Sequence, residues 1–153
     1  MKYKEFVASL DQLAIVEAIK RAERRCSGEI RVHVQPKSWG GEIRQVAQKT
    51  FERLGMTKTA QRNGILLFIA TDDQRFVILG DQGIHERVGA DFWEKVVMRI
   101  GERFKLSQFN EGIIEAIDDA GSLLALHFPF EKSDVDELSD EISFSDEEGP
   151  YEE

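Results

Sequence analysis

Two apolar segments separated by four polar residues constrain the fold of this chain more than any other feature of its sequence. Residues 64–70 are apolar throughout, and residues 76–79 are apolar again. The intervening Thr71-Asp72-Asp73-Gln74 has the composition of a turn. Because neither segment alternates with polar residues, both faces of the strands should be covered. The pattern therefore predicts an antiparallel hairpin in the centre of a sheet.

Antiparallel pairing brings the start of the first strand next to the end of the second. Asn63-Gly64 would then lie beside Gly80-Asp81. Neighbouring strands are about 5 Å apart, so an amide, a carboxylate and a glycine-bracketed turn would meet at one edge of the sheet. We take this edge as the candidate functional site.

The charge of the chain is unevenly distributed. The 153 residues are 41% hydrophobic and 32% charged with a net charge of -9, which suits one globular domain. Residues 131–153 contain eleven acidic residues and one lysine, so residues 1–130 carry a net charge of +1. We expect a domain over residues 1–130 followed by an acidic, mobile tail over 131–153. The nearly neutral domain argues against nucleic-acid binding.

The cellular location follows from features that the sequence does not contain. The first residues have no apolar signal-peptide core, and no apolar run reaches the roughly 18 residues of a transmembrane segment. Cys26 is the single cysteine, so an internal disulfide is impossible. We therefore expect a cytoplasmic protein without a transmembrane segment.

The remaining secondary structure predicts a layered fold. Asp11 is a suitable N-cap for a helix that buries Leu13, Val16, Ile19 and Ala22. Residues 29–35 alternate like a strand with one less covered face, and helical periodicity follows over 43–54, 92–104 and 113–128. A strand, a helix and a doubly buried strand in succession predict a parallel crossover. The expected fold class is α/β, a three-layer α/β/α sandwich with a small mixed central sheet.

Several kinds of site are excluded by residue spacing. The cysteine and the three histidines have no zinc-ligand spacing, and residues 134–145 lack the glycine and the final glutamate of an EF-hand loop. Val135, Leu138 and Ile142 within the tail would share one face of a helix. The tail is therefore either a solvating extension or a short docking motif.

The candidate ligands at the sheet edge are Asp81, Asn63 and Glu29. If residues 29–35 run parallel to the first hairpin strand, Glu29 begins at the same edge as Asn63. Carboxylate and amide oxygens are the ligands that Ca²⁺ and Mg²⁺ take, and glycines near Asp81 would let backbone carbonyls approach an ion. The alternative is structural, because Asn and Asp side chains also bind the backbone of turns.

Several motifs, in this order, resemble those of the TPM domain, a family named for a thylakoid-lumen protein, a photosystem II repair factor and a receptor-associated membrane protein. The resemblance covers about residues 10 to 130. The motifs are Gly28-Glu29-Ile30, Phe51-Glu52-Arg53-Leu54-Gly55-Met56, Arg62-Asn63-Gly64-Ile65-Leu66-Leu67, Gly80-Asp81-Gln82-Gly83-Ile84 and Phe109-Asn110-Glu111-Gly112. The sequence around residues 126–129 and 136–141 is similar to the ending of soluble, stand-alone bacterial members.

The resemblance implies a three-layer α/β/α fold. It also implies Ca²⁺ or Mg²⁺ binding, as in some members, and acid phosphatase activity, as claimed for a plant member. Many members carry an aspartate after the Gly-Ile turn, and Asp91 matches that aspartate only with a shift of one residue. Many members also have a signal peptide and a membrane anchor.

Three functions are compatible with these observations. The first is a non-catalytic module that binds a divalent cation at the sheet edge and presents that surface to a protein partner, including one at a membrane. The second is a metal-assisted acid phosphatase, in which Arg62 and Arg87 would balance phosphate charge. No serine or threonine near the edge has an adjacent base in the sequence, which favours the first. The third is a purely structural domain.

Overall fold

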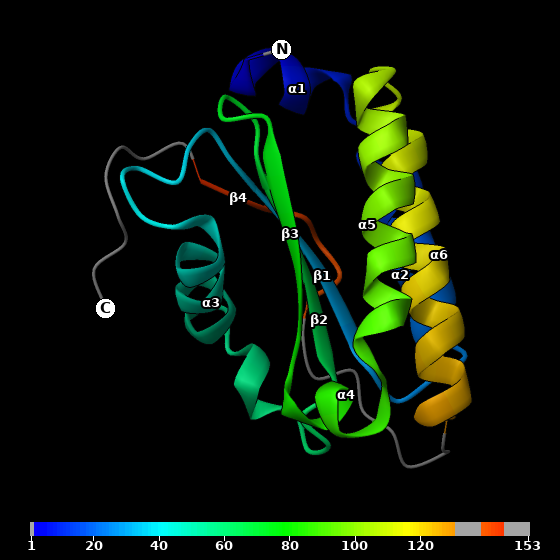
Figure 1. Ribbon diagram of the computed structural model, residues 1–153. Helices are drawn as coiled ribbons and strands as arrows, with labels where there is room; N and C mark the ends of the chain where they lie inside the picture. Colours follow the sequence, from blue (N-terminus) through cyan, green and yellow to red (C-terminus); the bar gives the residue numbers. More distant parts are fainter. Residues whose placement is uncertain (1, 131–138, 146–153) are drawn as a thin grey trace.

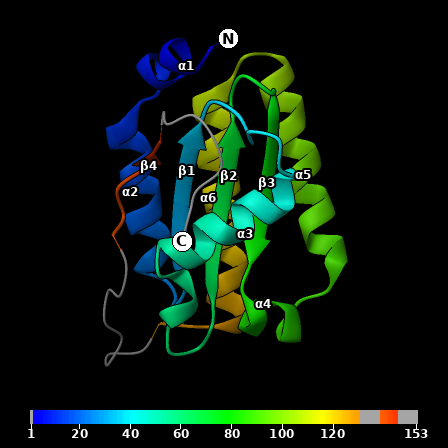
Figure 2. The ribbon, with the colours of Figure 1, turned by 90° about the vertical axis from the view of Figure 1, so that its left-hand side faces the viewer.

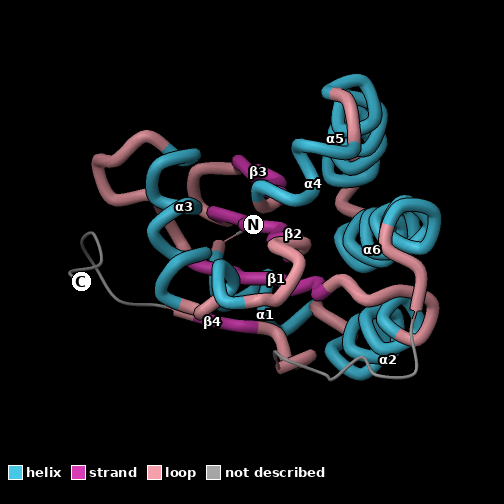
Figure 3. Tube along the Cα trace, turned by 90° about the horizontal axis from the view of Figure 1, so that it is seen from below, coloured by secondary structure: helices cyan, strands magenta, loops and turns pink. Residues whose placement is uncertain are grey.

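The computed structural model describes residues 2–130 and 139–145 and shows a mixed α/β domain. The elements in chain order are α1 (Tyr3–Ser9), α2 (Gln12–Glu23), β1 (Glu29–Gln35), α3 (Ile43–Arg53), the 3-10 helix η1 (Met56–Lys58), β2 (Gly64–Ala70), β3 (Arg75–Gly80), α4 (Gln82–Arg87), α5 (Ala90–Lys105), α6 (Phe109–His127) and β4 (Ser143–Phe144). Figures 1 and 3 show the sheet between α3 on one face and α2, α5 and α6 on the other. The predicted α/β/α sandwich is therefore confirmed.

The sheet has the strand order β3-β2-β1-β4. The predicted antiparallel pairing of β2 and β3 is confirmed, with Ile65 opposite Gly80. The prediction that the whole hairpin is central and covered on both faces was wrong for β3, which is an edge strand with only Val77 and Leu79 buried. The parallel pairing of β1 and β2 is also confirmed, with Glu29 opposite Gly64. The sheet is mixed for this reason, and the first strand of the hairpin lies in its interior.

The two faces of the sheet are buried in two separate hydrophobic clusters. Every residue of β2 is buried, because α3 covers one face of this strand and the three long helices cover the other (Figure 2). Helix α2 begins after Asp11, whose side chain accepts a hydrogen bond from Ala14 N as expected of an N-cap. Leu13 was expected in the core but is 82% exposed, whereas Ile15 is fully buried. Val16, Ile19 and Ala22 are buried as predicted, so the prediction was wrong only at Leu13.

Strand β1 carries polar residues on the face that it shares with the α3 cluster. His33 and Gln35 are fully buried there, and the imidazole stacks on the Phe68 ring at 5.4 Å. The two imidazole nitrogens lie 2.8 Å from Ser143 Oγ and Gln35 Oε1. Burial lowers the pKa of His33 to about 4, so the ring is neutral at pH 7.

The C-terminal region differs from the expected tail where the structure describes it. The predicted mobile segment falls partly on residues 131–138 and 146–153, which lie outside the described residues. Between them, β4 pairs parallel with β1, and Ser145 N donates to Val34 O at 3.0 Å. Ile142 is only 8% exposed and joins the core on the side of the long helices. This segment packs on the sheet because Ile142 makes an apolar contact with the core, which the acidic composition of the segment did not indicate.

Several short elements were not predicted, namely α1, η1, α4 and β4. Each is seven residues or shorter, too short for periodicity to identify it. None of the helices within the described residues is long and apolar enough to cross a membrane.

Candidate functional site

The three predicted ligands lie at one end of the sheet. Glu29 begins β1, Asn63 precedes β2, and Asp81 follows β3, which runs in the opposite direction. Asp81 N donates to Gly64 O at 3.0 Å, and Glu29 N donates to Asn63 O at 3.5 Å. Glu29 and Asp81 therefore flank β2 on opposite sides, about 10 Å apart at two strand spacings.

The Asp81 carboxylate is engaged in an ion pair. Arg62 Nε and Nη2 donate to Asp81 Oδ2 and Oδ1 at 2.7 and 2.8 Å, which is the bidentate geometry of a strong pair. Gln82 N donates to Oδ1 at 2.8 Å, so Asp81 also caps α4. The Asp81 side chain is 7% exposed and the Arg62 side chain 43%. A cation at Asp81 would have to displace the guanidinium group.

Gly83 is required by a close backbone approach. Its N–H donates to Arg62 O at 2.8 Å, and a Cβ at this position would lie 2.2 Å from Gln61 O. Any larger residue would push α4 away from the loop before β2. The glycine that we expected to admit an ion thus holds the Arg62 loop in place.

Asn63 contributes one buried oxygen without a donor. The side chain is 1% exposed, and its Nδ2 donates to Ser27 Oγ at 3.4 Å. Oδ1 has no hydrogen-bond partner among the described residues. A buried carbonyl oxygen without a donor is uncommon and costs free energy. The amide can therefore accept a further partner.

Glu29 lies in an acidic cluster that the sequence analysis did not identify. The cluster is formed by Glu23 at the end of α2, Glu29 at the start of β1 and Asp140 in the C-terminal segment. One carboxylate oxygen of each lies within 4.8 Å of the other two, and Glu29 is 3% exposed. Glu23 Oε2 also accepts a hydrogen bond from Ile30 N at 3.0 Å. Asp81 does not belong to this cluster.

The electrostatics of the cluster favour a protonated Glu23 carboxyl group. Burial raises the pKa of Glu23 well above its usual range, and the hydrogen bond with Asp140 and the charge of Glu29 raise it further. Asp140 also interacts with the charge of Arg31, whose pKa is lowered mainly by burial.

The local sequence gives only a weak indication that Glu23 belongs to a functional cluster, and no indication that Asp140 does. Glu23 is an acidic residue in the last turn of a helix, where the helix dipole disfavours negative charge. Asp140 is one of eleven acidic residues after residue 130 and differs from the others only in its tertiary position. The cluster could not be assembled without the packing of β4 on β1.

Among the described residues, the hydroxyl that hydrogen-bonds to the Asn63 side chain has no base to activate it. Ser27 is the hydroxyl next to Asn63, and its Oγ accepts from Asn63 Nδ2 and Gln61 Nε2. The hydroxyl itself lies 3.5 Å from Phe128 O. These partners are amides and a carbonyl, none of which can take a proton as a general base.

Comparison with known proteins identifies the family. The family model described as the TPM domain matches residues 2–123. This chain belongs to the TPM domain family. The NMR structure of the BA42 protein from the psychrophilic bacterium Bizionia argentinensis is 41% identical to the chain, with a TM-score of 0.83. The similarity covers 88% of this chain and 92% of that one.

A more distant structure shares only the fold. The solution NMR structure of the N-terminal domain of a protein from P. gingivalis is 18% identical, with a TM-score of 0.62 over 75% of this TPM chain and 76% of that chain. Among proteins with curated descriptions, none matches the chain significantly. The resemblance noted in the sequence is thus confirmed at the level of family and fold.

Proposed function

We propose that this TPM domain is a non-catalytic module that binds a divalent cation, Ca²⁺ or Mg²⁺, at the acidic cluster of Glu23, Glu29 and Asp140. The observation that carries the proposal is the approach of three carboxylates to within 4.8 Å, with Glu29 almost fully buried. Oxygens on opposite sides of a Ca²⁺ ion lie about 5 Å apart, so one ion can contact all three groups.

The electrostatic state of the cluster supports this proposal. Without an ion, the raised pKa of Glu23 keeps that carboxyl group protonated. A divalent cation would replace the proton and balance the charges of Glu29 and Asp140, which removes their mutual repulsion. Cation binding should therefore release a proton and become tighter as the pH rises.

The ligand set expected from the sequence, Asp81, Asn63 and Glu29, stays a second form of the same proposal. Glu29 is common to both sets, and Asn63 Oδ1 is a buried oxygen that can accept a partner. Asp81 is the less favourable ligand because Arg62 already neutralises it through two hydrogen bonds. We therefore place the ion on the Glu29 side of β2.

Substitutions separate these two ligand sets. We expect Glu29→Gln and Asp140→Asn each to weaken Ca²⁺ binding tenfold or more, roughly 1.4 kcal/mol, because each removes a full charge. Asp81→Asn should leave the affinity unchanged. Isothermal titration with Ca²⁺ and with Mg²⁺ gives the affinities, and amide chemical-shift changes locate the ion.

Two controls make the test specific. Glu17→Gln removes an exposed carboxylate from α2 and should leave Ca²⁺ affinity unchanged. In the metal-free protein, Glu29→Gln should raise stability, since it removes a charge next to Glu23. Lost affinity in Asp81→Asn with full affinity in Glu29→Gln would move the site to Asp81. Absence of any response to both cations would refute the proposal.

Ion binding would also organise a surface for a protein partner. Asp140 lies two residues before Ile142 in the segment that packs on β1, so an ion at the cluster joins this segment to the domain. The partner, including one at a membrane, would bind the surface at which the ion joins this segment to the domain. A pull-down with and without Ca²⁺ tests this, and only capture that needs both Ca²⁺ and Asp140 supports it.

The phosphatase alternative has less support. The Ser27 hydroxyl has no adjacent base, and Arg62 is already paired with Asp81. We expect turnover of generic phosphomonoesters to be absent or very slow with Ca²⁺ or Mg²⁺ present. Robust turnover that Asp81→Asn abolishes and Glu17→Gln retains would reverse this ranking.

A further inference from the structure

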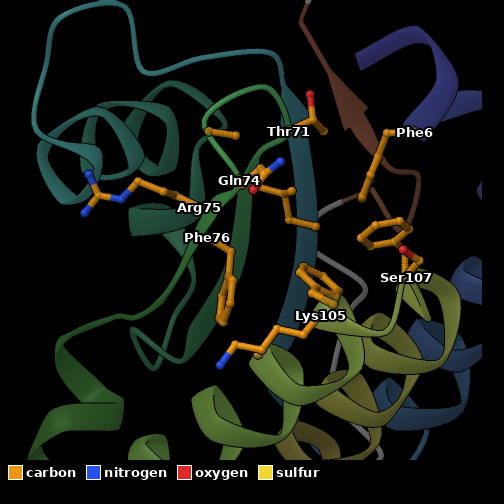
Figure 4. Close-up of a pocket in the computed structure, with 12 residues that line it drawn as sticks. Phe6, Thr71, Gln74, Arg75, Phe76, Lys105 and Ser107 are labelled. Carbon is orange, nitrogen blue, oxygen red and sulfur yellow. The ribbon is translucent and has the colours of Figure 1, made fainter. Parts of the chain in front are cut away.

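A cavity of about 510 Å³ opens at the end of the sheet opposite the acidic cluster. Its walls come from α1, the end of β2, the turn before β3, the last turns of α5 and the start of α6 (Figure 4). The carboxyl end of β2, which runs parallel to β1, lines the cavity, and small ligands of α/β proteins commonly bind beyond the carboxyl ends of parallel strands. The volume is within the range of small-molecule sites.

The inner wall of the cavity is aromatic. The rings of Phe6 and Phe109 are 4.8 Å apart, those of Phe109 and Phe104 5.3 Å, and those of Phe104 and Phe76 5.4 Å. All four line the cavity. This continuous apolar wall suits the hydrocarbon part of a ligand.

The rim of the cavity supplies hydrogen-bond donors and positive charge. Gln74, Lys105 and Ser107 are exposed residues of the lining. Figure 4 shows the Lys105 side chain extending from α5 toward Phe76, whereas the Arg75 guanidinium group points away toward α3. Among the described lining residues none is acidic. An anionic head group therefore fits this rim better than a cationic one.

The carboxylates of Asp72 and Asp73, which adjoin the lining residues Thr71 and Gln74 in the sequence, are both hydrogen-bonded. Asp73 Oδ2 accepts from Ser38 N at 2.9 Å. Asp72 Oδ1 accepts from Tyr3 N at 2.8 Å and from Thr71 Oγ1 at 3.1 Å. These bonds attach α1 to the turn and so help to form the cavity wall. They leave Lys105 as the charged group directed across the opening.

Three lining residues are not those that the fold alone would favour. Gln74 and Ser107 have φ angles of 53° and 59°, the left-handed region in which glycine is the relaxed residue. Gly101 lies inside α5, where glycine lowers the stability of the helix relative to alanine. A Cβ at Gly101 would meet no atom within 4 Å, so packing does not require a glycine there. Gln74 and Ser107 therefore place polar groups on the rim, and Gly101 leaves space in the wall, although all three residues lower the stability of the fold.

We propose that this cavity binds a small amphipathic anion, a medium-chain fatty carboxylate. The hydrocarbon chain lies along the phenylalanine wall and the open side of Gly101. The carboxylate lies at the rim, where Lys105 balances its charge and Ser107 and Gln74 donate hydrogen bonds. The site is separate from the acidic cluster and does not depend on a bound cation.

Titration of isotope-labelled protein with monomeric decanoate tests the site. We expect saturable amide shifts in residues 69–76 and 101–109. Gly101→Leu should weaken binding more than about tenfold by filling the cavity, while the leucine favours the helix. Ser107→Gly should weaken binding about threefold and raise the melting temperature, because it removes a donor and relaxes the backbone.

Charge is tested with a second pair of variants and a second ligand. Lys105→Gln should weaken decanoate binding about threefold, and Lys95→Gln, on the same helix outside the cavity, should not change it. Decyltrimethylammonium should bind much more weakly than decanoate. Equal binding of the two ligands, or unchanged decanoate binding in folded Gly101→Leu and Ser107→Gly, would overturn the proposal.

Discussion

Glu23 and Glu29 hold two carboxyl groups close together where neither is fully hydrated. Burial raises the pKa of Glu23, and the Glu29 charge adds to this effect. Such pairs are common where a protein binds a cation or a proton, because the repulsion between the carboxylates is relieved only when one arrives. Their cost in the metal-free protein is measurable as a dependence of stability on pH.

The raised pKa of Glu23 predicts that the metal-free protein loses stability as the pH rises. The folded protein keeps a proton that the unfolded chain releases above the ordinary pKa of 4.5. We expect the free energy of unfolding, measured with urea in EDTA, to fall between about pH 5 and about pH 8 relative to Glu23→Gln, which lacks the titrating group. Saturating Ca²⁺ should remove this difference.

The titration of His33 changes the stability with pH in the opposite direction, so its effect must be separated from that of Glu23. Its folded pKa of about 4 is below the ordinary 6.5, so it stabilises the fold above pH 6.5, and this stability is lost as the pH falls through 4. Glu23→Gln and the wild type share His33, so the difference between their pH dependences reports the titration of Glu23. An identical pH dependence in both proteins would contradict the assigned cause.

At the scale of elements, the shortest strand has a larger role than its length suggests. Ile142, just before β4, is 8% exposed within the core. We expect Ile142→Ala to destabilise the protein by about 2 kcal/mol, because it leaves a cavity against β1. Phe144→Ala, at a residue 36% exposed, should cost less than about 1 kcal/mol. Urea unfolding measures both, and equal small losses would mean that the segment is not held in solution.

The contact of α2 with α6 depends on the absence of a side chain at Gly121. A Cβ there would lie 2.7 Å from Ala22 Cβ, closer than packed carbon atoms approach. We expect Gly121→Ala to destabilise the domain by about 1 kcal/mol or more, even though alanine favours the helix. Adding Ala22→Gly removes the overlapping methyl group, so the free energy of unfolding in urea should rise again. A Gly121→Ala protein more stable than the wild type would contradict this packing.

For the whole molecule, the sheet separates two proposed sites. The acidic cluster lies at the start of β1, and the cavity lies at the end of β2 and the start of β3. Deletion of residues 139–153 removes Asp140 and Ile142 but keeps both covering layers of β2. We expect Ca²⁺ affinity to fall about tenfold while decanoate affinity stays unchanged. Calorimetric titration of the shortened chain measures both, and a parallel loss would show that the two ends are coupled.

Much of the fold follows from local sequence patterns. The hairpin over residues 64–80 was predictable because two apolar strands and their turn are adjacent in the chain. The Asp11 cap and the helices after it were predictable because capping and helical spacing act within a few residues. Leu13 shows the limit, since it has the predicted helical spacing but lies in the first turn of α2, where it is 82% exposed.

The candidate sites depended on tertiary structure. Sequence placed Glu29, Asn63 and Asp81 at one end of the sheet, because strand direction and register follow from the pattern. It could not show that Asp81 binds Arg62 or that Glu29 meets Glu23 and Asp140, since side-chain partners are chosen by packing. Asp140 reaches the cluster only because Ile142 docks on the sheet, a contact between residues more than one hundred positions apart in the chain. Local propensity specifies the elements, whereas contacts distant in sequence specify which charged groups share one environment.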